Sequence, residues 1–163
     1  MALKHDTRND LPRKTRERMA ELLGDRLADA LDLRSQLKQA HWNVKGPNFI
    51  GLHKLFDDVV ESVDDYSDEI AERAVQLGAV VVGTVRTAAK RTSMKEYPLD
   101  IADGRDHVEA VADALAAFGK AARTAIDTAD KAGDKDTADL FTEVSRGIDK
   151  HLWMVEAHGQ AES

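Results

Sequence analysis

Apolar residues recur at helical spacing through most of the chain. Over residues 19–37 they stay close to that spacing, which predicts a long first helix across residues 12–42. The segment Lys-Gly-Pro-Asn at residues 45–48 then interrupts the pattern, because both Gly and Pro stop helices. A second helix is expected over residues 48–77, followed by Gly78 in the place of a helix-ending glycine.

The next region is less regular. Residues 79–83, Ala-Val-Val-Val-Gly, resemble a short strand, but a single strand has no partner here, so we interpret them as a buried connection. Residues 84–91 are expected to form a short helix inside a long link. Third and fourth amphipathic helices are predicted over residues 103–130 and 136–157, and Ala-Gly-Asp at residues 132–134 makes the turn between them.

These elements predict an all-α fold, a ferritin-like four-helix bundle with a short helix in the crossover between the second and third helices. The bundle is expected to span residues 12–158. Residues 1–11 are polar, mixed in charge and without periodicity, which predicts a mobile basic and polar tail. Residues 159–163 are expected to be a short C-terminal tail.

Length and composition are those of one globular domain. The chain has 163 residues, of which 42% are hydrophobic and 33% are charged. Its formal net charge of −7 does not favour nucleic-acid binding by the body of the protein. The charged start lacks the apolar core of a signal peptide, and the longest stretch without Asp, Glu, Lys or Arg, residues 74–85, is too short to cross a bilayer. A cytoplasmic protein without membrane contact is therefore expected.

The absent residues and motifs limit the chemistry. Cysteine is missing, which excludes disulfides and thiolate metal sites, so any metal must be held by His, Asp, Glu or backbone oxygen. Nucleotide-binding, zinc-protease and nucleophile-elbow motifs are absent as well. None of the six histidines has Glu three residues before it, so the Glu-x-x-His pairs of di-iron bundles are not available.

The second helix carries a polar row on the face opposite its apolar stripe. The row consists of His53, Asp57, Glu61, Asp64, Asp68 and Glu72, which follow one another at intervals of four, four, three, four and four residues. On an exposed helix such a row is often only a solvated face. Here, however, no Lys or Arg stands between Lys54 and Arg73 to pair with these acids. Clustered carboxylates without counter-charges repel one another, so a bound cation is a natural remedy.

The row separates into two half-sites. His53 with Asp57 forms one and Asp68 with Glu72 forms the other, since each pair is four residues apart. At a rise of about 1.5 Å per residue, Asp57 and Glu72 stand roughly 22 Å apart and cannot share one metal ion. The two pairs are symmetric about residues 62–63. Two copies of the helix packed antiparallel around that point would make two identical sites, each built from both chains.

His41 lies at the end of the first helix, just before the Gly-Pro break. A histidine there can be a capping or surface residue, or it can add a second imidazole to the site that contains His53. A mixed His and carboxylate ligand set with open positions suits Fe(II), and also Zn(II), Co(II) or Mn(II). The neighbouring Trp42 is interpreted as a helix-end core aromatic in preference to a redox-active side chain.

At these positions the chain resembles the Dps family, the DNA-binding proteins from starved cells, which are mini-ferritins. The resemblance extends over about residues 20–157. Its most specific segments are Lys-Gln-Ala-His-Trp-Asn at 38–43, Phe-Ile-Gly-Leu-His at 49–53, Asp57, Asp-Glu-Ile-Ala-Glu-Arg at 68–73, Gln-Leu-Gly at 76–78, Tyr-Pro-Leu-Asp at 97–100 and Asp-Lys-His-Leu-Trp at 149–153.

The resemblance implies a dodecamer with a hollow centre and ferroxidase sites at two-fold interfaces. One subunit would provide His41, His53 and Asp57, and the other Asp68 and Glu72, in agreement with the spacing of the half-sites. Members of the family oxidise Fe(II), preferentially with hydrogen peroxide, and store Fe(III) as a mineral in the cavity. Consuming both reactants protects DNA from oxidative damage.

The resemblance also implies that iron enters through an acidic pore at a three-fold axis. Five acidic residues around the turn between the third and fourth helices are candidates: Asp127, Asp130, Asp134, Asp136 and Asp139. Each of them can equally be a solubilising acid that complements a helix N-terminus.

DNA binding depends on the N-terminal residues. Residues 1–18 contain three acidic side chains and six basic ones, namely Lys4, Arg8, Arg13, Lys14, Arg16 and Arg18. Twelve such segments on one cage would bind phosphate through avidity and without base specificity. In relatives, however, short or immobile tails do not bind DNA. Two alternatives to a ferroxidase stay open: a nucleoid-packing DNA-binding protein with little catalytic role, and a helical assembly module whose acidic row only solvates an interface.

Overall fold

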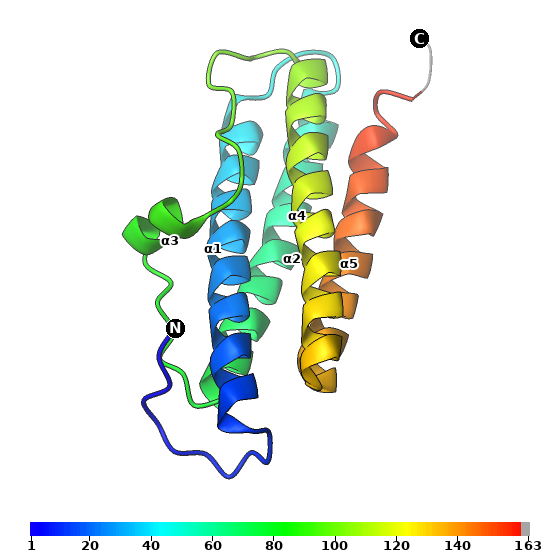
Figure 1. Cartoon of the computed structure of the whole chain (residues 1–163). Coiled ribbons are helices and arrows are strands. Elements are labelled where there is room, and N and C mark those ends of the chain that lie inside the picture. The colour runs from blue at the N-terminus through cyan, green and yellow to red at the C-terminus, as the bar shows by residue number, and fades with distance from the viewer. Residues whose placement is uncertain (161–163) are drawn as a thin grey trace.

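Four long helices lie side by side in a bundle, and one short helix packs on its outside (Figure 1). The structure is a computed structural model that describes residues 1–160. In chain order the helices are α1 (Arg13–Asn43), α2 (Phe49–Gln76), α3 (Val85–Arg91), α4 (Gly104–Ala132) and α5 (Lys135–Glu156). The predicted all-α ferritin-like bundle is confirmed, and every helix begins and ends within two residues of its expected position. No helix within the described residues is long and apolar enough to span a membrane.

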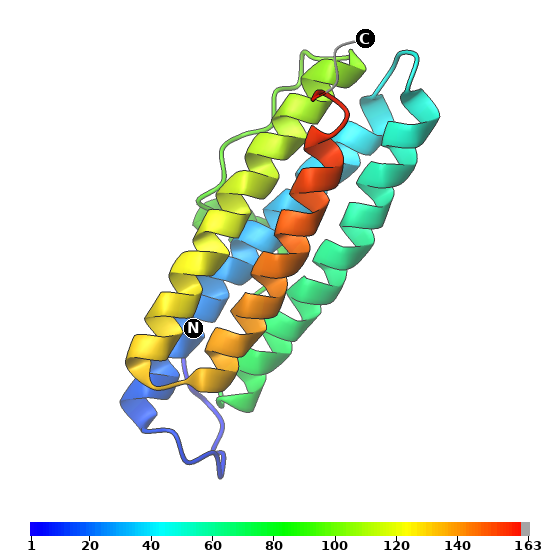
Figure 2. The ribbon, with the colours of Figure 1, turned by 90° about the vertical axis from the view of Figure 1, so that its right-hand side faces the viewer.

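A long crossover makes α2 and α4 run in the same direction. α1 and α2 form one antiparallel hairpin, and α4 and α5 form another (Figure 1, Figure 2). α2 ends at one end of the bundle and α4 begins at the other. The chain between them therefore travels along the outside of the bundle beside α1, with α3 packed against α1 on the way.

The core is formed by the apolar faces of the four long helices. Phe56 of α2, Phe118 of α4 and Phe141 of α5 are fully buried and share one core with Leu33 and Leu37 of α1. Burial of each such side chain stabilises the fold by about 1.5–3 kcal/mol. Because this packing fixes the rotation of α2 about its axis, it also decides which of its residues face away from the core.

Local backbone signals set the helix ends. Asp103 and Asp134 cap α4 and α5, where each carboxylate accepts a hydrogen bond from a backbone N–H two or three residues further on, at 2.8 and 3.0 Å. Gly78 follows α2 with a φ of 89°, and Gly133 follows α4 with a φ of 82°. Both lie in the left-handed region that favours glycine. Pro12 precedes α1 and is not its first helical residue as predicted.

The N-terminal residues lie along the start of the crossover. The backbone N–H groups of Lys4 and His5 both donate to the carbonyl oxygen of Gly78, at 3.0 and 3.1 Å. The N–H of Val80 donates in turn to the carbonyl oxygen of Ala2, at 3.2 Å. This short antiparallel bridge joins the beginning of the chain to the bundle, and residues 1–11 contain no helix.

The Val-rich segment 79–83 is a connection, as predicted, but only its beginning is buried. Ala79 is 1% exposed, whereas Val82 is 46% exposed. The expectation of a buried connection is therefore correct at one end and wrong at the other. Sequence reasoning found no partner for this segment because the partner, residues 2–5, lies at the far N-terminus.

Polar contacts fasten the crossover to α1. The guanidinium of Arg91 forms ion pairs with Asp25 and Glu21, both at 2.7 Å. Two residues later, Ser93 donates from its backbone N–H and its hydroxyl to the fully buried carboxylate of Asp29, at 2.7 and 3.1 Å. These bonds engage Oδ1 of Asp29 and position the link against the bundle, while the guanidinium of Arg26 lies 2.8 Å from Oδ2 and compensates the buried charge.

A buried ion pair fastens the opposite end of the bundle. Arg73, in the last turn of α2, donates to the carboxylate of Asp134 at 2.7 Å and to the hydroxyl of Thr137 at 3.0 Å. Asp134 also caps α5, so one carboxylate ties the end of α2 to the turn between α4 and α5. Arg73 and Asp134 are both buried, and the loss of either partner would leave an unpaired charge.

Replacing Arg73 with Met is expected to lower the free energy of unfolding by about 3–5 kcal/mol, because the carboxylate of Asp134 would stay buried without its cation. Arg13→Met is the control, since it removes an exposed ion pair with Glu17 and is expected to cost less than about 1 kcal/mol. Urea denaturation of both variants and the parent at one protein concentration measures the difference. Equal losses would contradict the structural role of Arg73.

Candidate metal centre

Two histidines meet at the turn between α1 and α2. His41 stands near the end of α1, His53 stands in the second turn of α2, and the loop between them reverses the chain. Their rings stack with centroids 3.7 Å apart and planes inclined by 22°. The Nδ1 of His41 lies 2.7 Å from the carbonyl oxygen of His53, and the Nδ1 of His53 lies 2.9 Å from the carbonyl oxygen of His41.

These reciprocal hydrogen bonds assign the protons of both rings. A carbonyl oxygen can only accept, so each Nδ1 must be the donor and carry a hydrogen. In the neutral ring the lone pair is then on Nε2, which is the nitrogen free to bind a metal ion. A hydrogen bond from the non-ligating nitrogen to a backbone carbonyl is a usual way in which proteins orient a metal-binding histidine. The chain therefore holds two imidazoles with their tautomers already set for ligation.

Asp57 completes this side of the site one helical turn after His53. Its Oδ1 lies 3.9 Å from the Nδ1 of His41 and forms an ion pair with Lys38 of α1. The hydrogen bond from Lys38 is the largest cause that lowers the pKa of Asp57, the positive charges of the neighbouring histidines and of Lys38 add to it, and partial burial opposes it. The side chain is therefore an ionised carboxylate at neutral pH, as a metal ligand must be.

The counter-charges of the acidic row come from α1. Sequence reasoning considered only cations on the same helix and found none, but Lys38 pairs with Asp57 and Arg34 pairs with Asp64. The inference from uncompensated carboxylates is therefore wrong for these two acids. Lys38 stands one turn before His41 on α1, a spacing that places both side chains on the same side of the helix. This spacing from His41 is the sequence signal that could have identified Lys38 as the counter-charge of Asp57.

Asp68 and Glu72 form a separate group further along α2. Both side chains are exposed, and within residues 1–160 neither has an ion-pair partner. Because α2 is continuous, its rise places Asp68 about 16 Å along the helix from Asp57. In the described part of the chain, no three His, Asp or Glu side chains converge where they could hold a metal ion. The structure thus stacks His41 on His53 and places Asp57 beside His41, but the three side chains do not converge on one metal position, and Asp68 and Glu72 lie apart from them.

More acidic side chains gather where α2 passes α5. The pKa of Glu69 is raised, first by burial and then by the negative charges of Glu143 on α5 and of Asp65 and Asp68 on α2. Burial is the largest cause of this shift, and the repulsion among the neighbouring carboxylates adds to it. This side of α2 is consequently a region of negative potential that would attract cations.

Trp42 is not part of the core. Its side chain is 64% exposed, so the interpretation of a helix-end core aromatic is wrong. Phe49 and Ile50, at the start of α2, are also exposed large apolar residues beside the same turn. Sequence periodicity placed Trp42 in the core because an apolar residue near a helix end has the same pattern whether it faces the core or a partner chain.

One of the five candidates for the acidic pore is excluded by its contacts. Asp134 is 1% exposed and is bound to Arg73 and Thr137, so it cannot line an open channel. Asp127, Asp136 and Asp139 are exposed, and Asp130 is exposed and paired with Lys135. Asp134 instead caps the N-terminus of α5 and pairs with Arg73. The alternative named for these acids is therefore correct in placing Asp134 at a helix N-terminus and wrong in making it a solubilising acid.

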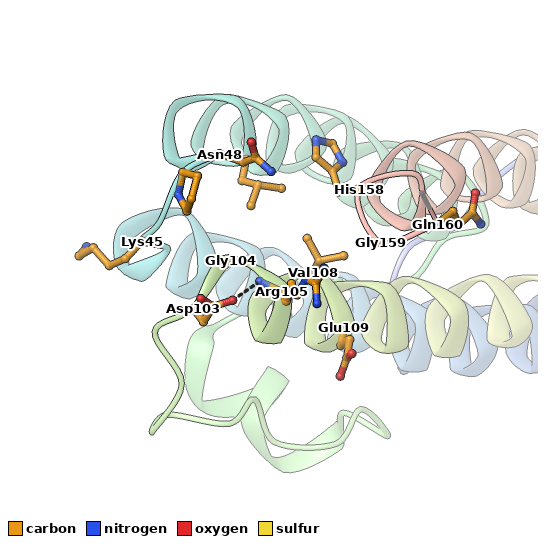
Figure 3. A pocket seen from close by; sticks show the side chains of 12 residues that line it. Lys45, Asn48, Asp103, Gly104, Arg105, Val108, Glu109, His158, Gly159 and Gln160 are labelled. Atoms are coloured by element: carbon orange, nitrogen blue, oxygen red, sulfur yellow. Dashed lines mark hydrogen bonds between the residues drawn. The ribbon is translucent and has the colours of Figure 1, made fainter. Parts of the chain in front are cut away.

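An open pocket lies at the end of the bundle where α2 and α4 begin (Figure 3). Lys45 and Asn48 from the α1–α2 turn, Asp103 and Arg105 at the start of α4, and His158 after α5 lie around it. The carboxylate of Asp103 is engaged by the backbone N–H of Arg105 at 2.8 Å, the bond drawn in Figure 3. The pocket contains none of the five candidate ligands.

Comparisons with known proteins agree with the fold. Residues 20–161 match the ferritin family, described as a ferritin-like domain. The DNA protection during starvation protein of Agrobacterium fabrum is 43% identical over 159 residues, which cover 98% of each chain. The matched domain and the bundle together define a ferritin-like protein.

Similarity to solved structures shows to which group of ferritin-like proteins the chain belongs. The tetragonal form of Mycobacterium smegmatis Dps is 33% identical with a TM-score of 0.89, and the match covers 94% of this chain and 93% of that one. Dps from Microbacterium arborescens in the high iron form is 34% identical with a TM-score of 0.85, and the match covers 95% and 99%. Within the ferritin-like proteins, the chain belongs to the Dps family, as the segments around the two histidines predicted.

Proposed function

We propose that two copies of this chain oxidise Fe(II) at shared sites on a two-fold interface and that a hollow dodecamer stores the Fe(III) product. His41, His53 and Asp57 of one copy would bind iron together with the partner's Asp68 and the partner's Glu72. The observation that carries this proposal is the pair of reciprocal hydrogen bonds that leaves the Nε2 lone pairs of both histidines available. A solvated face or a plain assembly surface has no need of such an arrangement.

A second copy is needed because of the straight course of α2. Asp57 and Asp68 are about 16 Å apart along one helix, so their side chains cannot meet within one chain. Two α2 helices crossing antiparallel near residues 62–63 would bring each histidine half-site against an acidic half-site of the partner. Exposed Trp42 and Ile50 beside the histidines give that interface apolar contacts.

The proposed oxidation requires the protein to bind iron and to compensate its charge, and it uses no protein nucleophile. Two Fe(II) ions give one electron each to one hydrogen peroxide, whose O–O bond breaks. With two water molecules the products are two FeO(OH) units and four protons. Carboxylates lower the cost of bringing two cations together, and mixed nitrogen and oxygen ligands with open positions suit Fe(II). Support for iron as the substrate comes from the related Microbacterium arborescens Dps, which was solved in a high iron form.

DNA binding is a second candidate function, supported by exposed cations near the N-terminus and by relatives named for DNA protection. The side chains of Lys4, Arg8, Lys14 and Arg18 are exposed. Arg16, in contrast, donates to the carbonyl oxygens of Leu11 and Leu77 and is engaged in holding the chain. Arg13 is exposed but paired with Glu17. Contacts to phosphate would therefore use the four exposed cations that have no ion-pair partner among the described residues, repeated around the cage.

Subunit mixing tests the shared site. Asp68→Ala/Glu72→Ala and His53→Ala/Asp57→Ala are each expected to abolish rapid Fe(III) formation when peroxide is added after anaerobic Fe(II) loading. Co-refolding the two inactive variants in equal amounts should restore about a quarter of the parent rate, because half of the random pairs are mixed and each mixed pair has one intact site.

The control is Glu109→Ala/Asp113→Ala, which removes an exposed acidic pair of the same spacing from α4 and should keep the parent rate. No recovery after mixing, with assembly confirmed by gel filtration, would contradict a site shared between chains. If the parent and every variant oxidised Fe(II) no faster than buffer without protein, the proposed ferroxidase activity itself would be contradicted.

DNA binding is tested by retardation of a linear duplex at several salt concentrations. The parent is expected to retard DNA at low salt and to lose affinity steeply as salt rises, because phosphate contacts release counterions. Lys4→Ala/Arg8→Ala/Lys14→Ala/Arg18→Ala should flatten that dependence while iron oxidation stays unchanged. If the parent leaves DNA unretarded even at low salt, the nucleoid-packing alternative is wrong.

A further inference from the structure

One buried side chain holds the last part of the crossover against the bundle. Tyr97 is buried, whereas the other residues from Ser93 to Asp103 are exposed or only partly buried. This stretch runs along the outside of the bundle beside α1 and leads into α4 (Figure 1). Its docking therefore depends on what Tyr97 contacts.

Two hydrogen bonds mark the ends of the stretch. Before the tyrosine, the side-chain amide of Gln36 on α1 donates to the carbonyl oxygen of Lys95 at 2.9 Å. After it, the backbone N–H of Lys45 donates to the carbonyl oxygen of Ala102 at 3.0 Å. Between these points, in the part of the chain that the structure describes, residues 96–101 have a single hydrogen bond to the bundle, that of the tyrosine hydroxyl.

The tyrosine hydroxyl is hydrogen-bonded to a buried histidine. Its oxygen lies 2.6 Å from Nδ1 of His107, which ends the first turn of α4 and is 1% exposed. The two rings stack with centroids 6.0 Å apart. On the other side of the imidazole, Nε2 is buried and has no hydrogen-bond partner within residues 1–160.

This arrangement suits the neutral imidazole and not its cation. The hydroxyl of Tyr97 can donate to the lone pair of Nδ1, and the ring then carries its single hydrogen on Nε2. An imidazolium has N–H groups on both nitrogens, and the one on Nε2 would find no acceptor among the described residues. Proton uptake by His107 would therefore bury a positive charge beside one neutral hydroxyl, which is costly.

We propose that the Tyr97–His107 pair is an acid-sensitive latch, which docks residues 96–101 at neutral pH and releases them when His107 takes up a proton. Release would uncover the apolar surface on which Tyr97 packs, while the bonds at Lys95 and Ala102 limit the movement to this segment. The inference is independent of the proposed iron oxidation, since neither residue of the pair is a candidate metal ligand.

The charged groups that act on His107 come from α4 and from the α1–α2 turn. Burial has the largest effect and lowers the pKa of His107, and Lys45 in the turn lowers it further. Asp106 and Asp103 at the start of α4 raise it, but the pKa stays below its ordinary value of 6.5. Tyr97 stays neutral, because burial raises its pKa. Once undocked, His107 titrates near its ordinary value, so docking is fully stabilised above about pH 6.5 and loses stability as the pH falls.

The test uses an engineered thiol, because the chain contains no cysteine of its own. Ile101→Cys places the reporter at a partly buried position that packs against the core, and Leu99→Cys places one at an exposed position nearby. The labelling rate of the first thiol divided by that of the second, at the same pH, reports opening of the segment. This ratio is expected to rise by about tenfold for each pH unit below 6.5, until the pKa of docked His107 is passed.

Three variants in the reporter background assign the effect. His107→Gln cannot take up a proton and should make the ratio independent of pH. Tyr97→Phe removes the hydroxyl and should raise the ratio at neutral pH by about fivefold, as expected for the loss of one hydrogen bond. His151→Gln is the matched control and should keep the response of the parent, because burial lowers the pKa of His151 as well, but on α5.

The inference would be overturned by a ratio that stays constant between about pH 8 and pH 5, or by a response that survives in His107→Gln. Loss of the response in His151→Gln would overturn it too, since another histidine would then be the sensor. Gel filtration checks the assembly of every variant at each pH. If the reporter variants fail to assemble, deuterium exchange at the imidazole C2 hydrogen gives the pKa of His107 in the unaltered chain, and a value of 6.5 or above would refute the latch.

Discussion

α2 runs without a break for 28 residues, and its regular rise spaces four of the five candidate ligands along one side of the helix. A side chain at Asp57 cannot reach Asp68 by any change of rotamer, so one chain cannot close a complete site on itself. Phe56 and Ile70 hold the apolar face of the same helix in the core. That packing directs the acidic row away from the core and makes it available to a second copy of the chain.

The cations around α2 divide into two roles. At one end of the helix Arg73 is buried and holds the bundle together through Asp134, where a loss would destabilise the fold. Along the middle, Arg34 and Lys38 reach from α1 to acids that are themselves half exposed, where an ion pair contributes little to stability. The distribution of burial thus separates the part of α2 that supports the fold from the part that is free for binding.

Much of this arrangement could be predicted from the sequence, because it depends on local signals. Periodicity and the Gly and Pro breaks place the five helices. The four-residue spacing of the acidic row predicts the two half-sites, which stay a prediction. The errors concern contacts between elements distant in sequence. In the sequence Asp134 resembles any other acidic residue in a turn, because its partner Arg73 is distant in the chain. Residues 79–83 likewise have no partner nearby in sequence, since they pair with residues 2–5. The exposure of Trp42 likewise depends on where the end of α1 stands in the bundle.

The histidine half-site belongs to a single hairpin, and this has a consequence for the order of folding. His41 and His53 are close in sequence, and their two hydrogen bonds span only the turn between α1 and α2. Contacts of such short separation cost little chain entropy to close and form early in helical proteins. The crossover, in contrast, docks through distant pairs such as Arg91 with Glu21. We therefore expect the geometry of the two imidazoles to be set by contacts within the first hairpin and to be independent of how the crossover docks.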